Sequence, residues 1–198
     1  DALLDTRVWS RLPAIAERFW SATGSGTDED VYPRLEHHIG CLSDRFGIEV
    51  IPTFDEYPGL EPLLEMLEPV KWYARLLGMD LLEARANGLG EADFPRPYDA
   101  TTPLDRIVDR LPPESFAARR CAADITAGES QRWIEGWRAQ ADEFRACVEK
   151  DVRLEELRGA SRALAVLAEA VATGAPVDGD LAGPYGEYLL APVFWLAT

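Results

Sequence analysis

The chain has 198 residues, a mass of 22.0 kDa and a formal net charge of -15 at pH 7. Its 47% hydrophobic content, with six Trp, seven Phe and six Tyr, excludes a disordered chain. The negative charge repels phosphate groups and anionic lipids, so we expect no direct binding to nucleic acid or to a membrane surface. The longest apolar stretch, residues 188–197, is too short to cross a bilayer, which takes about 20 residues.

The cysteines and the basic residues indicate the setting of the protein. Cys41, Cys121 and Cys147 are widely spaced, which fits neither a disulfide framework nor paired zinc ligands, and we expect a cytoplasmic protein. Nearly all basic residues are arginine, a bacterial-like composition typical of GC-rich coding sequence. Because the sequence opens on Asp1 rather than Met, we also expect a trimmed chain.

The first third of the chain predicts two helices and an extended loop. The first helix ends near residue 23, Pro13 can break it, and its apolar positions follow helical spacing: Val8, Leu12, Ile15 and Phe19. A second helix is expected from a cap at Asp30, which would place Pro33 in its first turn, to about Phe46. Residues 48–54 contain Pro52 and have no evident partner strand, so we predict a loop.

The middle of the chain predicts short helices around a long linker. Leucines at positions 60–67 indicate a short amphipathic helix, and Glu68 and Pro69 are expected to begin another that continues to about residue 86. Residues 88–102 are rich in Gly and Pro, which is typical of a lid, a binding arm or a disordered segment. Thr102 and Pro103 then predict the start of a helix that ends near Leu111, and its Asp105 and Asp109 read as a solvated, salt-bridged face.

The last third predicts three helices and a buried C-terminal segment. The helices are expected at 114–127, 129–152 and 154–172, and the apolar stripes of the last two predict an antiparallel hairpin. The aromatic run that ends at Trp195 is expected to be buried. Together these patterns predict an all-α fold, with residues 1–198 forming one bundle of about six to eight helices and a long Gly/Pro-rich linker.

The acidity is local. Residues 28–68 contain eleven Asp or Glu against Arg34 and Arg45, a net charge of -9. This surface would attract a basic protein, so our leading hypothesis is a protein-binding module, such as an inhibitor or an immunity-type protein. An acidic face that only keeps the protein soluble is the simpler explanation. The residues expected to contact the partner are Asp55, Glu56, Glu61, Glu65 and Glu68.

The alternative hypothesis is a small helical enzyme or ligand-binding protein. His37 and Cys41 are one helical turn apart and could hold a metal, while His38 is expected on the apolar face, where it could ligate a haem. Trp133 and Trp137 could line the ligand pocket. A hydrogen-bonded core histidine and ordinary core tryptophans are the simpler readings. No phosphate loop, nucleophile elbow, or paired metal motif occurs, so whether the protein is an enzyme stays undecided.

Overall fold

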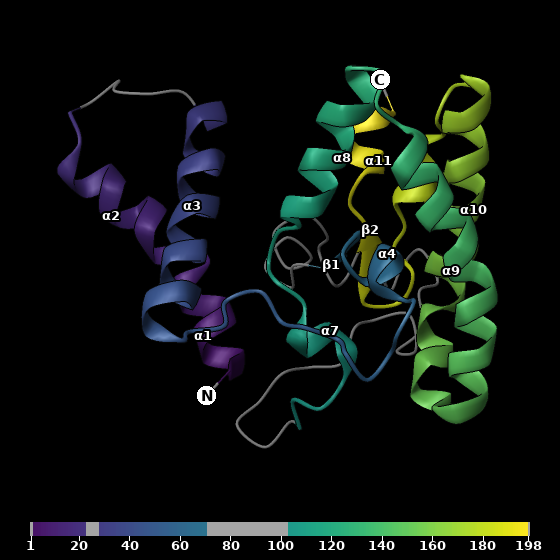
Figure 1. Cartoon of the computed structure of the whole chain (residues 1–198), viewed down its shortest axis with the longest axis horizontal. Coiled ribbons are helices and arrows are strands. Elements are labelled where there is room, and N and C mark those ends of the chain that lie inside the picture. The colour runs from purple at the N-terminus through teal and green to yellow at the C-terminus, as the bar shows by residue number, and fades with distance from the viewer. Residues whose placement is uncertain (1, 23–27, 71–102, 198) are drawn as a thin grey trace, which may run out of the picture.

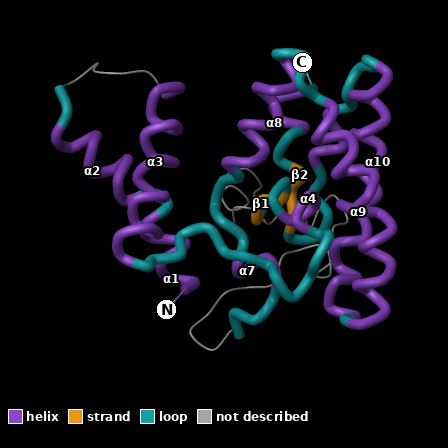
Figure 2. The backbone as a smooth tube through the Cα atoms, viewed as in Figure 1, coloured by secondary structure: helices purple, strands orange, loops and turns teal. Residues whose placement is uncertain are grey.

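A computed structural model describes residues 2–22, 28–70 and 103–197. This part is predominantly helical and includes one small two-stranded sheet, so the all-α prediction is confirmed (Figures 1 and 2). No helix among these residues is long and apolar enough to cross a membrane. The α-helices are α1 (Ala2–Trp9), α2 (Leu12–Trp20), α3 (Asp28–Phe46), α4 (Glu61–Leu64), α7 (Ile107–Arg110), α8 (Phe116–Thr126), α9 (Gln131–Lys150), α10 (Arg158–Thr173) and α11 (Val193–Leu196). The strands are β1 (Leu67–Pro69) and β2 (Tyr188–Leu190), and the 3₁₀-helices are η2 (Val152–Leu157) and η3 (Gly179–Ala182).

The helices α1, α2 and α3 form one side of the molecule, and α8 to α11 form the other (Figure 1). The break between α1 and α2 lies next to Pro13, which occupies the first turn of α2, where no backbone donor is needed. The predicted cap at Asp30 is wrong, because α3 already begins at Asp28 and contains Pro33 in its interior. It ends at Phe46, as predicted, because Gly47 adopts a positive φ of 64°.

The helices α9 and α10 form the predicted hairpin. Trp137 and Phe144 of α9 are buried against Leu164 and Leu167 of α10, as expected for two apolar stripes that face each other. One polar pair crosses this interface: the Gln140 side chain donates to the Ser161 carbonyl at 3.1 Å and accepts from the Ser161 hydroxyl at 3.0 Å. Because both side chains are buried, this reciprocal pairing satisfies groups that would otherwise destabilise the core.

The small sheet corrects the prediction for residues 67–70. Leu67, Glu68 and Pro69 form β1, which pairs antiparallel with β2, so they do not begin a helix. The preceding helix α4 is only four residues long. Leu67 lies opposite Leu190 in the register, and both are fully buried, so tertiary packing outweighs the helical pattern of the leucines. The helix predicted beyond residue 70 and the linker 88–102 lie outside the described residues.

The helix α7 is shorter than predicted. Residues 103–106 are not helical, and Arg106 occupies the N-cap position, where its backbone N–H donates to the Asp109 carboxylate at 3.1 Å. Asp109 is 1% exposed, so the expectation of a solvated acidic face is wrong for this residue. The carboxylate is used inside the fold because it satisfies the start of the helix.

The described residues contain two clusters of buried apolar side chains. The larger one joins α4, the sheet, α7, α8 and the α9–α10 hairpin. The smaller one lies around α3 and consists of Leu35, Ile39, Leu42, Val50 and Phe116. Phe116 belongs to α8, so this side chain connects the N-terminal helices with the rest of the molecule.

Candidate functional site

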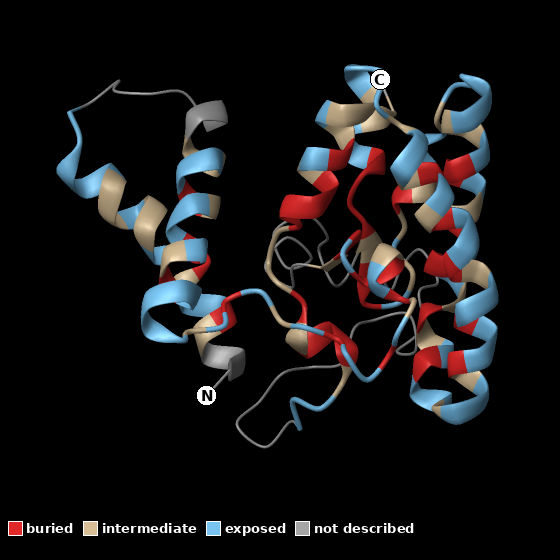
Figure 3. Ribbon diagram, in the orientation of Figure 1, coloured by how far each residue is buried: buried red, intermediate tan, exposed pale blue. Residues whose placement is uncertain are grey.

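The apolar side of α2 is exposed to solvent. No residue of this helix is buried, although its apolar positions follow the helical spacing that the sequence shows (Figure 3). We call the exposed apolar set of this helix the α2 face, and its side chains have these exposed fractions: Leu12 41%, Ile15 50%, Phe19 82% and Trp20 90%. Val8, near the end of α1, is 39% exposed. An amphipathic helix normally buries its apolar face, so this surface lacks the packing that its sequence is built for.

The polar side of α2, in contrast, faces α3. Glu17 lies about 140° around the helix from Leu12. Its carboxylate accepts from the Arg34 guanidinium at 3.1 Å, and this hydrogen bond lowers the pKa of Glu17. The apolar stripe of α3 packs in the smaller core instead.

Two aromatic side chains supply most of the area of the α2 face. An aromatic side chain offers about 150–250 Å² of surface, so Phe19 and Trp20 together expose roughly 300 Å². That area alone equals the largest apolar patch of many monomers, which is about 300–600 Å². The α2 face is therefore the strongest candidate for a protein-docking surface among the described residues.

The predicted histidine site lies on the surface of α3. His37 and His38 are both exposed, so the expectation that His38 belongs to the apolar face is wrong. Leu35, Ile39 and Leu42 supply that face instead. The structure does bring His37 and Cys41 together, with 3.6 Å between Nε2 and Sγ. No group of three or more His, Cys, Asp or Glu that could hold a metal occurs in the described part of the chain.

The five predicted partner-binding acids have different surroundings. Asp55 is exposed, and Thr53 donates a long hydrogen bond to it. Glu56 is exposed but forms an ion pair with Arg110, whose hydrogen bond lowers the pKa of Glu56. Glu68 accepts from the Ser115 backbone N–H at 2.8 Å, so it stabilises the start of α8.

Glu61 and Glu65 lie one turn apart at α4 and are both exposed. Nearby protein atoms partly desolvate the Glu65 carboxyl, and together with the charge of Glu61 this raises the pKa of Glu65. Within the described residues, neither carboxylate has a cationic partner. Glu56 has an ion pair and Glu68 a backbone donor, whereas this pair has neither among the described residues.

The two predicted pocket tryptophans have separate environments. Trp137 is fully buried in the larger core, where its Nε1 has no acceptor among the residues that the structure describes. Trp133 is half-buried and donates from Nε1 to Asp124 at 2.9 Å, with the Arg132 guanidinium over its ring. Trp137 therefore packs in the core, whereas Trp133 lies beside a surface ion pair. The structure does not bring the two tryptophans into one cavity with His37 or Cys41.

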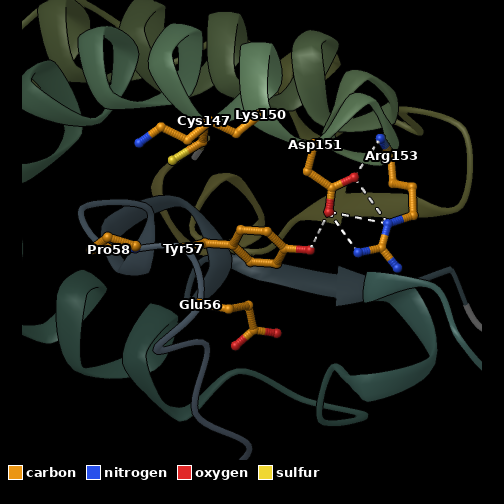
Figure 4. Close-up of a pocket in the computed structure, with 7 residues that line it drawn as sticks. All are labelled: Glu56, Tyr57, Pro58, Cys147, Lys150, Asp151 and Arg153. Carbon is orange, nitrogen blue, oxygen red and sulfur yellow. Dashed lines mark hydrogen bonds and ion pairs between the residues drawn. The ribbon is translucent and has the colours of Figure 1, made fainter.

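A shallow pocket lies where the loop around Tyr57 meets the end of α9 (Figure 4). The Tyr57 hydroxyl and the Arg153 guanidinium converge on the Asp151 carboxylate, at 2.9 Å from each of the Tyr57 Oη and the Arg153 Nε. The volume of the pocket, about 260 Å³, is small compared with that of ligand pockets, which measure about 300–1,000 Å³. The residues that line it are Glu56, Tyr57, Pro58, Cys147, Lys150, Asp151 and Arg153.

The sequence analysis missed this cluster. An Asp directly after a long helix is a recognisable capping signal, and Asp151 does accept from the Arg153 backbone N–H at 3.0 Å. The contribution of Tyr57 had no such signal, because it is 94 positions away in the chain.

Comparison with known proteins finds one partial similarity to report. The chain is 39% identical over 66 residues to the beta-hexosaminidase subunit A1 of Dictyostelium discoideum. This stretch covers 33% of the chain and 12% of that protein, so the chain spans a small fraction of the relative it matches. No family model and no solved structure matches the chain.

Proposed function

We propose that this chain is a protein-docking helical module, and that it docks through the α2 face onto the larger body of a hexosaminidase-type protein. The observation that supports docking is the exposure of the four large apolar side chains of α2. A protein-binding role agrees with the leading hypothesis from the sequence, but the surface is apolar rather than acidic.

The similarity to a hexosaminidase subunit supports the choice of partner. The 66 matched residues are only 12% of that protein, so it is much longer than the stretch it shares with this chain and would offer a large body for docking. The proposal covers a body in the same polypeptide and a body in a separate chain, and it includes hexosaminidase activity of the assembled protein. We also propose that the protein is cytoplasmic, because its three cysteines are free thiols and a reducing compartment keeps thiols free.

Two side chains are expected to carry most of the docking energy. Phe19 and Trp20 are almost fully exposed, and buried aromatic anchors dominate many protein interfaces. Removing roughly 300 Å² of apolar surface from water contributes about 7 kcal/mol before the costs of association are subtracted. The remaining residues of the α2 face then exclude water around these anchors.

Site-specific photo-crosslinking in the native host tests this proposal. The photoreactive amino acid p-benzoylphenylalanine replaces Phe19 or Trp20, and mass spectrometry identifies the crosslinked peptides. We expect peptides from a hexosaminidase-type protein, whether from the same polypeptide or from a separate one. The matched control carries the same group at Val166 of α10, which is 54% exposed but lies outside the α2 face. Products that contain only a second copy of this chain, or that also form from Val166, would refute the proposal.

A second candidate function concerns the acidic surface. We propose that Glu61 and Glu65 contact a basic protein, because their charges repel each other without compensation in the described part of the fold. A cation supplied by a partner would relieve this repulsion.

Salt-dependent binding tests the second candidate. Affinity for a captured basic partner should fall as ionic strength rises, and Glu61→Gln with Glu65→Gln should weaken it while Glu129→Gln, on an exposed residue before α9, should not. Affinity that is indifferent to salt and to the paired substitution would exclude this function.

The alternative hypothesis of a ligand-binding protein is reduced to a surface site on α3. A haem on His38 would have to sit on the surface, because that side chain is exposed, and the absorbance spectrum of the purified protein tests it directly. A metal on His37 and Cys41 remains the better-supported version.

A further inference from the structure

His37 and Cys41 occupy one exposed edge of the 19-residue helix α3. Their spacing of four residues places both side chains on the same side, one turn apart. The imidazole Nε2 and the thiol Sγ are 3.6 Å apart, and the Cys41 side chain is partly accessible. Both donors can therefore be reached from solvent without any change in the fold.

The distance between these atoms matches that required by zinc. A Zn–S bond of about 2.3 Å and a Zn–N bond of about 2.0–2.1 Å, at a tetrahedral angle, separate sulfur from nitrogen by about 3.6 Å. This is the separation already present between Sγ and Nε2. A zinc ion could thus bind both donors without changing the distance between Sγ and Nε2.

We propose that His37 and Cys41 form a surface site for Zn²⁺ and similar thiophilic divalent cations. On binding, the thiol loses its proton to solvent and the thiolate sulfur forms the metal bond, while neutral His37 supplies Nε2. No third protein ligand is in place among the described residues, so water fills the other two positions. The net charge of -9 on residues 28–68 attracts a cation to this part of the chain.

The donor set also predicts selectivity. Thiolate and imidazole favour Zn²⁺, Co²⁺ and Cd²⁺, whereas Mg²⁺ and Ca²⁺ prefer oxygen ligands. A surface rich in carboxylates would show the opposite preference, which separates this site from general cation binding by an acidic protein. The inference does not depend on docking by the α2 face.

Calorimetric titration of the whole chain with zinc tests the site. We expect one saturable site that becomes stronger as pH rises, and a loss of roughly tenfold or more in affinity for His37→Ala and for Cys41→Ser. The matched control is His38→Ala, since this neighbouring histidine is also exposed but has no recorded contact with the thiol. All three positions are at the surface of α3, and thermal unfolding checks that each variant is folded.

Cobalt provides a readout that a structural role could not produce. A thiolate-to-cobalt charge-transfer band should appear in the unaltered protein and in His38→Ala, and disappear in Cys41→Ser. Zinc should also slow alkylation of Cys41, and magnesium should not. Absence of the cobalt band, or equal losses of zinc affinity in His37→Ala and His38→Ala, would overturn the site.

Discussion

The Asp151 carboxylate joins two distant parts of the chain through one ionised group. It accepts from the Tyr57 hydroxyl and from Arg153, and these hydrogen bonds hold the pKa of Asp151 well below its ordinary value of 3.8. A carboxylate whose pKa is lowered by folding stabilises the folded state wherever it is ionised in both states. Its contribution is complete above the ordinary pKa and is lost as pH falls towards the folded value.

Replacing Asp151 tests this linkage. We expect Asp151→Asn to unfold at a lower temperature than the original protein at neutral pH, because an amide cannot attract the Arg153 guanidinium in the same way. The difference should shrink as pH is lowered from about 4 towards 2, because the unfolded carboxylate of the original protein takes up a proton in this range, whereas the folded one stays ionised to lower pH. Asp142→Asn, on a fully solvated ion pair of α9, provides the comparison and should show a smaller effect at all pH values. A difference that stays constant over this range would contradict the assignment.

Among the helices, α2 and α3 have similar apolar patterns, but the apolar side of α2 is exposed and that of α3 is buried. Leu12 of α2 is 41% exposed, whereas Leu42 of α3 is 7% exposed and packs in the smaller core. Helical spacing makes a side of a helix apolar, but it does not specify what that side contacts. This difference is why the sequence identified both helices but did not show which of the two apolar sides is buried.

Paired leucine substitutions measure that difference in the isolated chain. Leu42→Ala should lower the free energy of unfolding by about 2–5 kcal/mol, because it leaves a cavity in a packed cluster. Leu12→Ala should cost less than about 1 kcal/mol, as expected for a largely solvated position. Chemical denaturation of both variants provides the measurement. Equal losses would show that the α2 face is covered within the chain itself.

The β1–β2 pair illustrates a different limit at this scale. Each strand has three residues, and Leu67 meets Leu190 from the other end of the chain. Short apolar segments favour helix and strand almost equally, so only the partner decides between them. The sequence therefore predicted the leucines as core residues correctly but assigned part of them to the wrong element.

At the scale of the whole molecule, Phe116 and Arg119 of α8 connect the N-terminal helices to the rest. Phe116 fills the smaller core, and the Arg119 guanidinium lies over the rings of Tyr32 at 3.3 Å and Trp195 at 4.5 Å. The Tyr32 hydroxyl also donates to Glu114 at 3.2 Å. The Phe116 side chain, which we call the plug, and a few polar contacts thus position the α2 face relative to the larger core.

Removing the plug should loosen the N-terminal helices selectively. We expect Phe116→Ala to cost about 3–5 kcal/mol in stability and to speed amide hydrogen exchange in α3 more than in the α9–α10 hairpin. Phe194→Ala provides the control, since that side chain is 53% exposed and should change exchange little. Uniform acceleration in both regions would mean that the two cores unfold as one unit.

The sequence by itself determined the helical class, the α9–α10 hairpin and the ends of several helices. These features depend on local spacing and on capping residues such as Gly47 and Ser115, whose effects act within a few residues. Only the tertiary structure decided that the α2 face is uncovered, that His38 is exposed, and that His37 and Cys41 have the separation of zinc ligands. Burial depends on which surfaces pack together in the folded chain, and short-range periodicity does not show which segments those are.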